Sequence, residues 1–372
     1  MKIQFEKNPE QIELIKALAS ENKTVAMEAQ EAFAAFISDV VQQVLLQAGT
    51  ASMIYRDVEF DEDDSPSIPL DLYYGLNEGH ISVWSQTVGG GLPTNFVQGT
   101  QEMKVNTYRL DSAISMDKRY VRRARLDVVA AGLERMANEI LVKQERNAWA
   151  VILKLLAEAS TNGTEHVRRV GTAGTFQLDD MNKLFTLVRR LNAAYTGGTP
   201  QALQSRGLTD IYVSPEVKEQ IRAFAYQPMN TRAGSLNGTL AAGYSATSVA
   251  LPDSVREEIY RAAGTNEIFG VTVHELLELG EGRKYNDLFD TFRTTNIGGS
   301  AFASATDELI VGIDASRNAF LRPVAIQSET RGQVRVLPDD QFLARSQKVG
   351  FYSYVEEGRV AVDARAAVGL VV

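Results

Sequence analysis

The sequence has no cysteine and only three histidines among its 372 residues. Without cysteine there can be no disulfide, no catalytic thiolate and no zinc site built from thiolates, which fits a reducing cytoplasm. His80, His166 and His274 stand far apart and have no partner at helical spacing. We therefore expect each histidine to be a satisfied surface or core residue and none to be catalytic.

Long apolar runs and an excess of basic residues are also missing. No run reaches the ~18 apolar residues of a membrane helix, so no segment is expected to span a bilayer. The stretch from Met1 to Asn8 shows no apolar signal core with a cleavage site. The formal net charge is −9, whereas proteins that grip nucleic acid along their surface normally carry a basic balance. The 44% hydrophobic content suffices for two or three subdomains with cores of their own.

Motifs of enzyme chemistry are absent or incomplete. The segment from His274 to Glu278 begins like the helix motif of zinc proteases, but a glutamate stands where the second imidazole is needed. No G-x-S-x-G nucleophile elbow and no dinucleotide-binding glycine fingerprint occurs. We therefore expect a protein that is not an enzyme, with no catalytic residue, no cofactor-binding residue and no metal ligand.

Two clusters resemble ligand sites without meeting their requirements. A phosphate loop needs Lys-Ser/Thr and a helix start after its glycines, and the triplet Gly89, Gly90 and Gly91 lacks both, so flexibility is the better account. A calcium loop needs spaced ligands and a turn glycine. These are missing from the acidic run Glu59, Asp61, Glu62, Asp63 and Asp64. We interpret the run as a solvated loop or as an ion partner between subunits.

The most informative stretch runs from Ile81 to Ser160. Residues 81–88 and 100–110 alternate like the arms of an exposed β-hairpin, and a helical pattern without a proline or a glycine pair follows over 117–158. About 42 helical residues span roughly 60 Å, whereas a usual helix has ~11–12 residues. This combination favours a wall built from many copies, because the rod braces a flat subunit and the arm reaches a neighbour.

Shorter patterns surround this stretch. Residues 8–48 predict helices with an apolar stripe, which either pack on their own domain or dock as an arm on another subunit, the second being slightly favoured. At the end of the chain, Val349–Val355 and Val360–Leu370 alternate around Glu356-Glu357-Gly358 and predict a hairpin. The other expected elements are strands over 52–58, 210–213 and 267–275, and helices after Asp179 and over 215–224 and 252–263.

The parts follow one another as a helical arm, a strand, a hairpin arm, a long helix, a β/α middle and closing strands. Three phrases accompany this order: Ile211-Tyr-Val-Ser-Pro215 before a short helix, Ile268-Phe-Gly270, and Glu357-Gly-Arg-Val-Ala-Val-Asp-Ala-Arg365. Together they resemble the major capsid protein of tailed bacteriophages, the Hong Kong 97-type capsid fold, over essentially the whole chain. The resemblance implies an α+β protein. Its parts would be an N-terminal helical arm (1–51), a peripheral domain (52–69, 113–206 and 326–372) with a spine helix (117–160), an extended β-hairpin loop (70–112) and an axial domain (207–325).

The resemblance also implies a function. The chain would self-assemble into pentamers and hexamers of an icosahedral shell that encloses double-stranded phage DNA without sequence specificity. It would reside in the virion after assembly in the host cytoplasm, with scaffolding, portal and cement proteins as further partners and no membrane. An acidic chain suits such a container, because a strongly basic lining would trap the DNA. The alternatives are an encapsulin-type nanocompartment shell, a phage tail or portal structural protein, and a cytoplasmic enzyme with a polar pocket.

Contacts between subunits are expected at three places. The acidic run and the glycine tip are two of them, and the basic cluster that starts the long helix is the third: Lys118, Arg119, Arg122, Arg123 and Arg125. Each charged cluster repels itself within one chain. The alternative is that the charges pair within one chain or stay solvated. The isopeptide bond of some family members is not expected, since the hairpin arm offers only Lys104 and residues 327–372 contain no asparagine.

Overall fold

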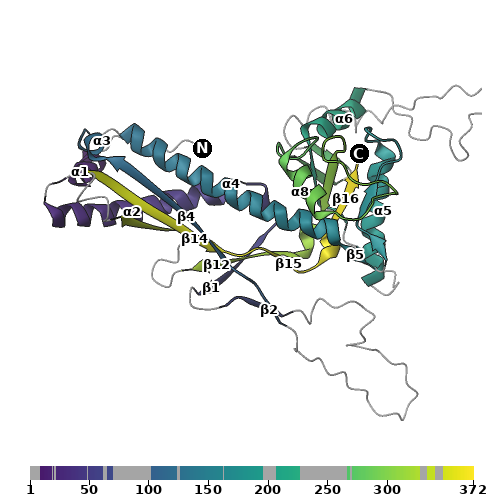
Figure 1. The fold of residues 1–372 in the computed structure, drawn as a ribbon, viewed down its shortest axis with the longest axis horizontal. Coiled ribbons are helices and arrows are strands. Elements are labelled where there is room, and N and C mark those ends of the chain that lie inside the picture. Colours follow the sequence, from purple (N-terminus) through teal and green to yellow (C-terminus); the bar gives the residue numbers. More distant parts are fainter. Residues whose placement is uncertain are drawn as a thin grey trace, which may run out of the picture. The chain divides into compact units, whose positions relative to one another are not determined.

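The computed structural model describes residues 9–18, 20, 22–47, 49–61, 65–69, 102–123, 126–161, 163–195, 207–226, 266–268, 270–326, 333–339 and 347–372. They form two compact units (Figure 1). Unit 1 holds the described residues up to 69 together with 102–148 and 320–360, and unit 2 holds those from 149–319 and 361–372. These bounds differ from those of the expected peripheral and axial domains, whose assignment stays a prediction.

Two helices begin unit 1. Pro9 opens α1 (Pro9–Leu18), because the N–H that proline lacks has no intrahelical partner at the first position of a helix. α2 (Lys23–Gln47) follows and packs against α1. The apolar residues that these helices bury in the core of the unit include Ile15, Leu18, Phe33, Ala34 and Ile37. The helices thus pack on their own unit, so the slightly favoured expectation of a docking arm gives way to its alternative.

A mixed sheet supports these helices. Its strands run in the order β1 (Arg56–Asp61), β12 (Phe320–Ile326), β14 (Lys348–Glu357) and β13 (Arg335–Asp339), with β4 (Tyr108–Asp117) paired along β14 and β15 (Val360–Ala361) paired with β12. β1 and β12 are parallel, whereas β4 and β13 are antiparallel to β14. Ile114 lies opposite Phe351 and Met116 opposite Val349. These alternate residues join the helical core, so the sheet buries one face against the helices.

The chain leaves and rejoins unit 1 at a short two-stranded ladder. β2 (Ser67–Pro69) and β3 (Glu102–Lys104) are antiparallel, with Ser67 opposite Lys104. Between them lie the expected hairpin arm 81–88 and the glycine tip, which are outside the described residues. The second expected arm, 100–110, is divided between β3 and the start of β4. The ladder fixes a common base for the 70–101 segment.

The long helix begins later than the sequence pattern indicates. Asp117 has an extended backbone, and its carboxylate accepts the N–H of Arg119, which caps a separate short helix α3 (Lys118–Arg122). Arg123 then leaves helical geometry, with φ −85° and ψ 5°. The long helix α4 (Leu126–Glu158) has 33 residues. At 1.5 Å per residue it spans roughly 50 Å, so the expected rod exists but is shorter than expected.

Unit 2 is built on a second mixed sheet. Its strand order is β7 (Val167–Arg169), β16 (Ala367–Val371), β11 (Leu309–Ile313), β8 (Asp210–Val213), β10 (Val271–Glu275) and β9 (Asn266–Ile268). The described helices of the unit are α5 (Leu178–Tyr195), α6 (Pro215–Tyr226), α8 (Lys284–Phe292) and the last turns of α4. β5 (Ser160–Thr161) and β6 (Thr164–Glu165) form a small ladder. The strand 210–213 and the helix after Ser214-Pro215 agree with expectation.

The central strands of this sheet are covered on both faces. Ile310, Val368 and Leu370 share a core with α5 and α6. On the other face the side chain of Leu156 lies 2.9 Å from where a Cβ on Gly369 would stand, so only glycine fits beneath this helix without a shift. Every residue of β11 and β16 is buried as a result.

The expected C-terminal hairpin is wrong. β14 pairs with β4, β13 and β12, whereas β16 pairs with β11 and β7 in the other sheet. The connecting chain donates from Gly358 N–H to the carbonyl of Pro323 and from Val362 N–H to that of Ala319. A 3-10 turn, Ala364–Ala366, capped by Asp363, then redirects it. Two alternating segments in succession look like a hairpin in sequence, although each finds its partners elsewhere in the chain.

Two further expectations are revised. The single strand expected over 267–275 is the antiparallel pair β9 and β10, because Gly270 adopts a positive φ of 78° and reverses the chain. Glu357, expected in a turn, is the last residue of β14. The helix expected over 252–263 lies outside the described residues.

Candidate assembly surfaces

The two described histidines are held by structural contacts. His274 Nε2 lies 2.9 Å from Asp210 Oδ1 on the neighbouring strand, and its ring stacks on Tyr212 with centroids 4.9 Å apart. His166 is fully buried, with Nδ1 3.0 Å from the carbonyl oxygen of Ala367, and desolvation lowers its pKa. His80 lies outside the described residues. Both arrangements are those of satisfied histidines.

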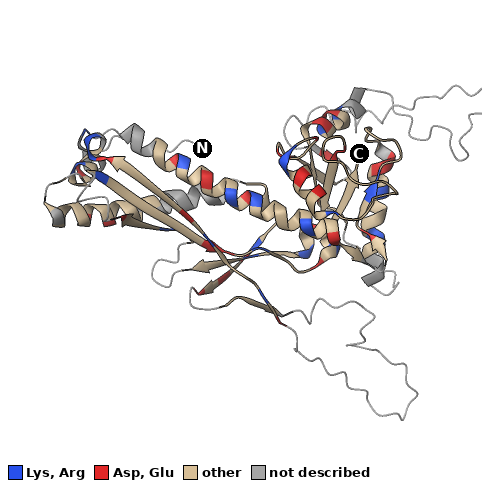
Figure 2. Cartoon of the chain, in the orientation of Figure 1, with Lys and Arg blue, Asp and Glu red and all other residues tan. Residues whose placement is uncertain are grey.

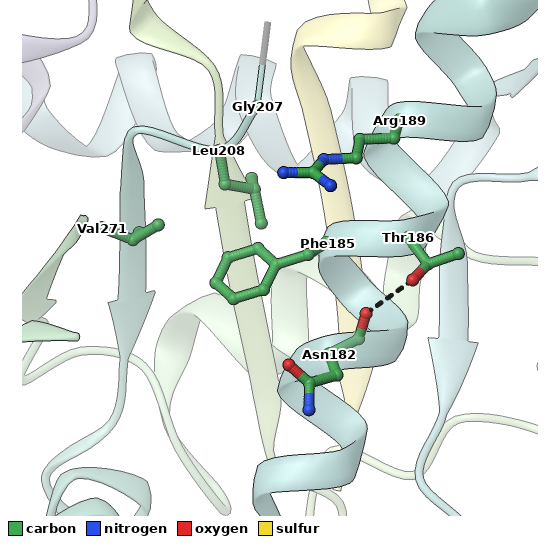
Figure 3. A pocket seen from close by; sticks show the side chains of 7 residues that line it. All are labelled: Asn182, Phe185, Thr186, Arg189, Gly207, Leu208 and Val271. Atoms are coloured by element: carbon green, nitrogen blue, oxygen red, sulfur yellow. Dashed lines mark hydrogen bonds between the residues drawn. The ribbon is translucent and has the colours of Figure 1, made fainter. Parts of the chain in front are cut away.

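A groove on unit 2 offers no reactive chemistry. It has a volume of about 370 Å³ and is lined by Asn182, Phe185, Thr186, Arg189, Gly207, Leu208 and Val271. Phe185 points from α5 toward Leu208 and Val271, and the Thr186 hydroxyl donates to the Asn182 carbonyl oxygen at 2.9 Å (Figure 3). Its lining thus combines apolar groups with one arginine and no acid–base pair.

Two further properties concern the described part of the chain only. In it, no three or more His, Asp or Glu side chains are grouped so that they could hold a metal ion. None of its helices is both long enough and apolar enough to cross a membrane.

The outer face of the unit 1 sheet carries arginines and tyrosines. Arg109 Nε lies 2.7 Å from Asp111 Oδ1, and another of its nitrogens donates to the Tyr352 hydroxyl at 2.8 Å. Its guanidinium lies 3.7 Å from the centre of the Tyr354 ring, and Arg335 donates to the Tyr354 hydroxyl at 2.9 Å. The Tyr352 hydroxyl donates to Asp111, and this bond lowers the pKa of that carboxyl. Arginine and tyrosine are enriched in protein interfaces, so this face suits contact with another protein.

A buried carboxylate joins several strands of unit 1. Glu357 has no exposed side-chain surface. Its Oε1 accepts from the Tyr108 hydroxyl at 2.9 Å, and its Oε2 accepts from Arg322 Nε at 2.7 Å and Gln144 Nε2 at 3.1 Å. Arg359 lies 3.3 Å from the same oxygen. Burial and the neighbouring Glu357 charge raise the pKa of Tyr108 to about 12, so its hydroxyl remains a donor. Sequence reasoning missed this joint because its members come from four distant segments.

A second joint fastens the end of the N-terminal helices to α4. Glu145 accepts the backbone N–H groups of Thr50 and Ala51 at 3.0 and 3.1 Å, and the Thr50 hydroxyl also donates to it. Gly49 turns the chain there with a φ of 125°, a conformation that favours glycine. The joint determines where the chain passes from α2 into β1.

Five of the expected contact residues have described side chains: Glu59, Asp61, Arg119 and Arg123 are exposed, and Lys118 is half-buried. The others lie outside the described residues: Glu62, Asp63, Asp64, Gly89, Gly90, Gly91, Arg125 and the side chain of Arg122. The two acids stand on β1, whereas the two arginines stand at α3, where basic residues gather (Figure 2). The described members of the two sets thus stand on different elements of unit 1.

No protein-family profile and no curated protein sequence matches the chain. Solved structures similar to it include the capsid of cyanophage P-SCSP1u, with 13% identity, coverage of 87% of this chain and 88% of that chain, and a TM-score of 0.46. Another is the capsid of the native GTA particle, with 16% identity, coverage of 87% and 90%, and a TM-score of 0.47. The holo-SrpI encapsulin complex from Synechococcus elongatus has 12% identity, coverage of 73% and 75%, and a TM-score of 0.38.

Proposed function

We propose that the chain is a major capsid protein, a structural subunit that self-assembles into the pentamers and hexamers of an icosahedral shell. The observation that carries the proposal is the succession of β2, β3, β4 and α4. The chain leaves unit 1 after β2 and returns at β3, which pairs with β2 in one ladder. It then continues into the ten-residue strand β4 and, further on, into the 33-residue helix α4. A wall subunit needs these parts, because an arm that reaches a neighbour must be anchored beside a rod.

The sheet of unit 1 supports the same proposal. One of its faces packs on helices, while the other carries Arg109, Arg335 and Tyr352 around the buried ring of Tyr354. Contacts through such a face need only modest strength in a shell, because each subunit makes many of them at once. The polar groups described above hold strands and helices in place, and the proposed role is accordingly not catalytic and uses no cofactor.

The proposed partners follow from the role. The shell would enclose double-stranded DNA without sequence specificity, and a net charge of −9 is compatible with DNA that must slide during packaging. Scaffolding, portal and cement proteins are further proposed partners. The proposed location is the virion, after assembly in the host cytoplasm.

Particle imaging of the purified chain, alone and with co-expressed scaffolding candidates, tests the proposal. Closed icosahedral particles are expected. Rings would instead indicate a tail or portal component, and a chain that stays monomeric at high concentration under all these conditions would contradict a shell role. Nucleic acid measured in particles from infected cells distinguishes a genome container from a nanocompartment, whose particles would hold protein cargo.

A further inference from the structure

Five basic side chains from three segments converge at one end of unit 1. We define the basic end as Lys16, Lys118, Arg119, Arg123 and Lys348. α1, which carries Lys16 in its last turn, packs against α3. The Lys118 N–H donates to the carbonyl of Gln347 at 2.9 Å, which brings the start of β14 next to α3. Figure 2 shows the Lys and Arg colour gathered around α3. Sequence reasoning found only the cations of residues 118–125, because the other two lie far away in the chain.

The basic end has no acidic partner among the described residues. None of its five side chains forms an ion pair there, although thirteen other ion pairs are formed in the described chain. The carboxylate nearest in sequence, that of Asp117, accepts the backbone N–H of Arg119 and caps α3. Like charges at this spacing repel each other, so the basic end favours an external anion.

Unit 1 also carries unpaired carboxylates. Glu59 and Asp61 alternate on one face of β1, both exposed and neither in an ion pair with a described residue. Asp57 precedes them on the same face, 3.5 Å from Arg322. We define the acidic strand as Glu59 and Asp61.

The acidic strand cannot reach the basic end of its own unit. Glu59 lies opposite Val324 of β12, and Val324 lies opposite Glu357 at the end of β14. Lys348 is at the beginning of β14, a strand of ten residues. Ten extended residues span roughly 30 Å, well beyond a salt bridge and beyond the ~8 Å screening length at physiological ionic strength. Glu59 and Asp61 are therefore too far from Lys348 along the sheet to pair with it.

We propose that the basic end of one subunit docks on the acidic strand of a second copy. The two surfaces are complementary in charge, have no ion partner among the described residues, and lie too far apart in unit 1 to meet, so a head-to-tail contact between copies would pair both. Such heterologous contacts close into rings when the rotation between copies permits, which suits pentamers and hexamers. The inference rests on the proposed function and specifies which surfaces its subunits bring together.

Two charge-reversed chains test the contact. The basic-end variant carries Arg119→Glu, Arg123→Glu and Lys348→Glu, and the acidic-strand variant carries Glu59→Lys and Asp61→Lys. The matched control reverses two exposed charges on α4, Lys143→Glu and Glu139→Lys. Self-association is measured by sedimentation at low and high salt, and circular dichroism checks that each monomer is folded. If the basic-end variant, with its three substitutions, fails to fold, the acidic-strand variant, with two, still tests the contact.

Each variant alone is expected to self-associate at least about tenfold more weakly than the wild type at low salt, with the control unchanged. Mixing the two variants should restore association between unlike chains, because the negative end of the first variant matches the positive strand of the second, and the positive end of the second matches the negative strand of the first. A chain with both reversals should assemble again.

If either variant alone assembles as well as the wild type, or if the chain with both reversals does not assemble, the contact is overturned while the shell role stays intact. Loss of short duplex DNA binding in the basic-end variant alone, without rescue, would show that the basic end takes a nucleic acid backbone instead. Wild-type chains that never associate would contradict both proposals.

Discussion

Arg322 Nε lies 2.7 Å from Oε2 of Glu357, and this carboxylate has no exposed side-chain surface. A charge buried this completely is tolerated because Tyr108 and Gln144 donate to it as well. The four groups come from β12, β14, β4 and α4, so one carboxylate connects the sheet to the long helix. The pair therefore helps to hold the sheet of unit 1 against α4.

Removing this carboxylate should destabilise unit 1 strongly. Glu357→Ala leaves Arg322, Tyr108 and Gln144 without the buried carboxylate that they share, while Arg322 keeps only the longer 3.5 Å contact with Asp57. We expect a loss of about 3–5 kcal/mol in the free energy of unfolding, measured with urea. The neighbouring Glu356→Ala is the control: Glu356 is half-exposed and accepts from the Thr107 hydroxyl, so its loss should cost about 1 kcal/mol or less. Equal losses in the two variants would show that the joint is not structural.

Two buried glutamines should respond in opposite directions to the same substitution. Gln30 is 1% exposed, and neither its side-chain oxygen nor its nitrogen has a partner among the described residues. Gln144 is also buried but donates to Glu357. Gln30→Leu should therefore raise the free energy of unfolding by about 1 kcal/mol, whereas Gln144→Leu should lower it by about 1–2 kcal/mol. Urea titration of both variants checks this, and destabilisation by Gln30→Leu would mean that the amide is satisfied in solution.

The local elements of this fold are predictable from sequence. The strand Asp210–Val213 is recognisable because Ser214-Pro215 ends it and a helix follows. The core stripe of α4 is recognisable from the helical spacing of its apolar residues. The division into α3 and α4 is harder to predict, because it depends on one capping bond from Asp117 and on the backbone of Arg123.

Strand partners and spatial charge clusters are not predictable in this way. Alternation places β14 and β16 as strands, yet nothing in their spacing indicates that they belong to different sheets. Glu357 looks like a turn residue until its partner Arg322 is placed beside it. Lys16 and Lys348 join the basic end only through the packing of α1 and the register of β14. Such information resides in pairs of residues that are distant in sequence.

Shells of this protein should contain no covalent links between subunits. Lys104 lies exposed on β3 at the base of the 70–101 segment, and residues 327–372 contain no asparagine to react with it. Mature particles boiled in denaturant should therefore run as one band near 40.9 kDa on a gel. A ladder of higher bands would contradict this expectation and indicate a different pair of linking residues.

A buried carboxyl in unit 2 should make stability depend on pH. Glu308 is 5% exposed, and its Oε1 accepts the backbone N–H of Glu281 at 3.2 Å, while Oε2 has no partner among the described residues. Desolvation raises the pKa of Glu308 above its usual 4.5, with hydrogen bonds from Ser214 and Glu281 opposing the shift and the nearby Glu216 and Glu281 charges adding to it. The folded protein thus holds this proton more tightly than the unfolded chain.

The direction of the pH effect follows from that difference. The stability contributed by protonated Glu308 is fully present below about pH 4.5 and is lost as the pH rises through the raised pKa of the folded state. Glu308→Gln keeps the hydrogen-bonding shape without the charge. We expect the variant to match the wild type near pH 4 and to be more stable near pH 8, by urea unfolding. Glu219→Gln is the control, because Glu219 is exposed on α6 and is not among the charges that raise the pKa of Glu308, so its change should show little dependence on pH. An advantage of Glu308→Gln that is the same at both pH values would contradict the prediction, because it would not come from ionisation.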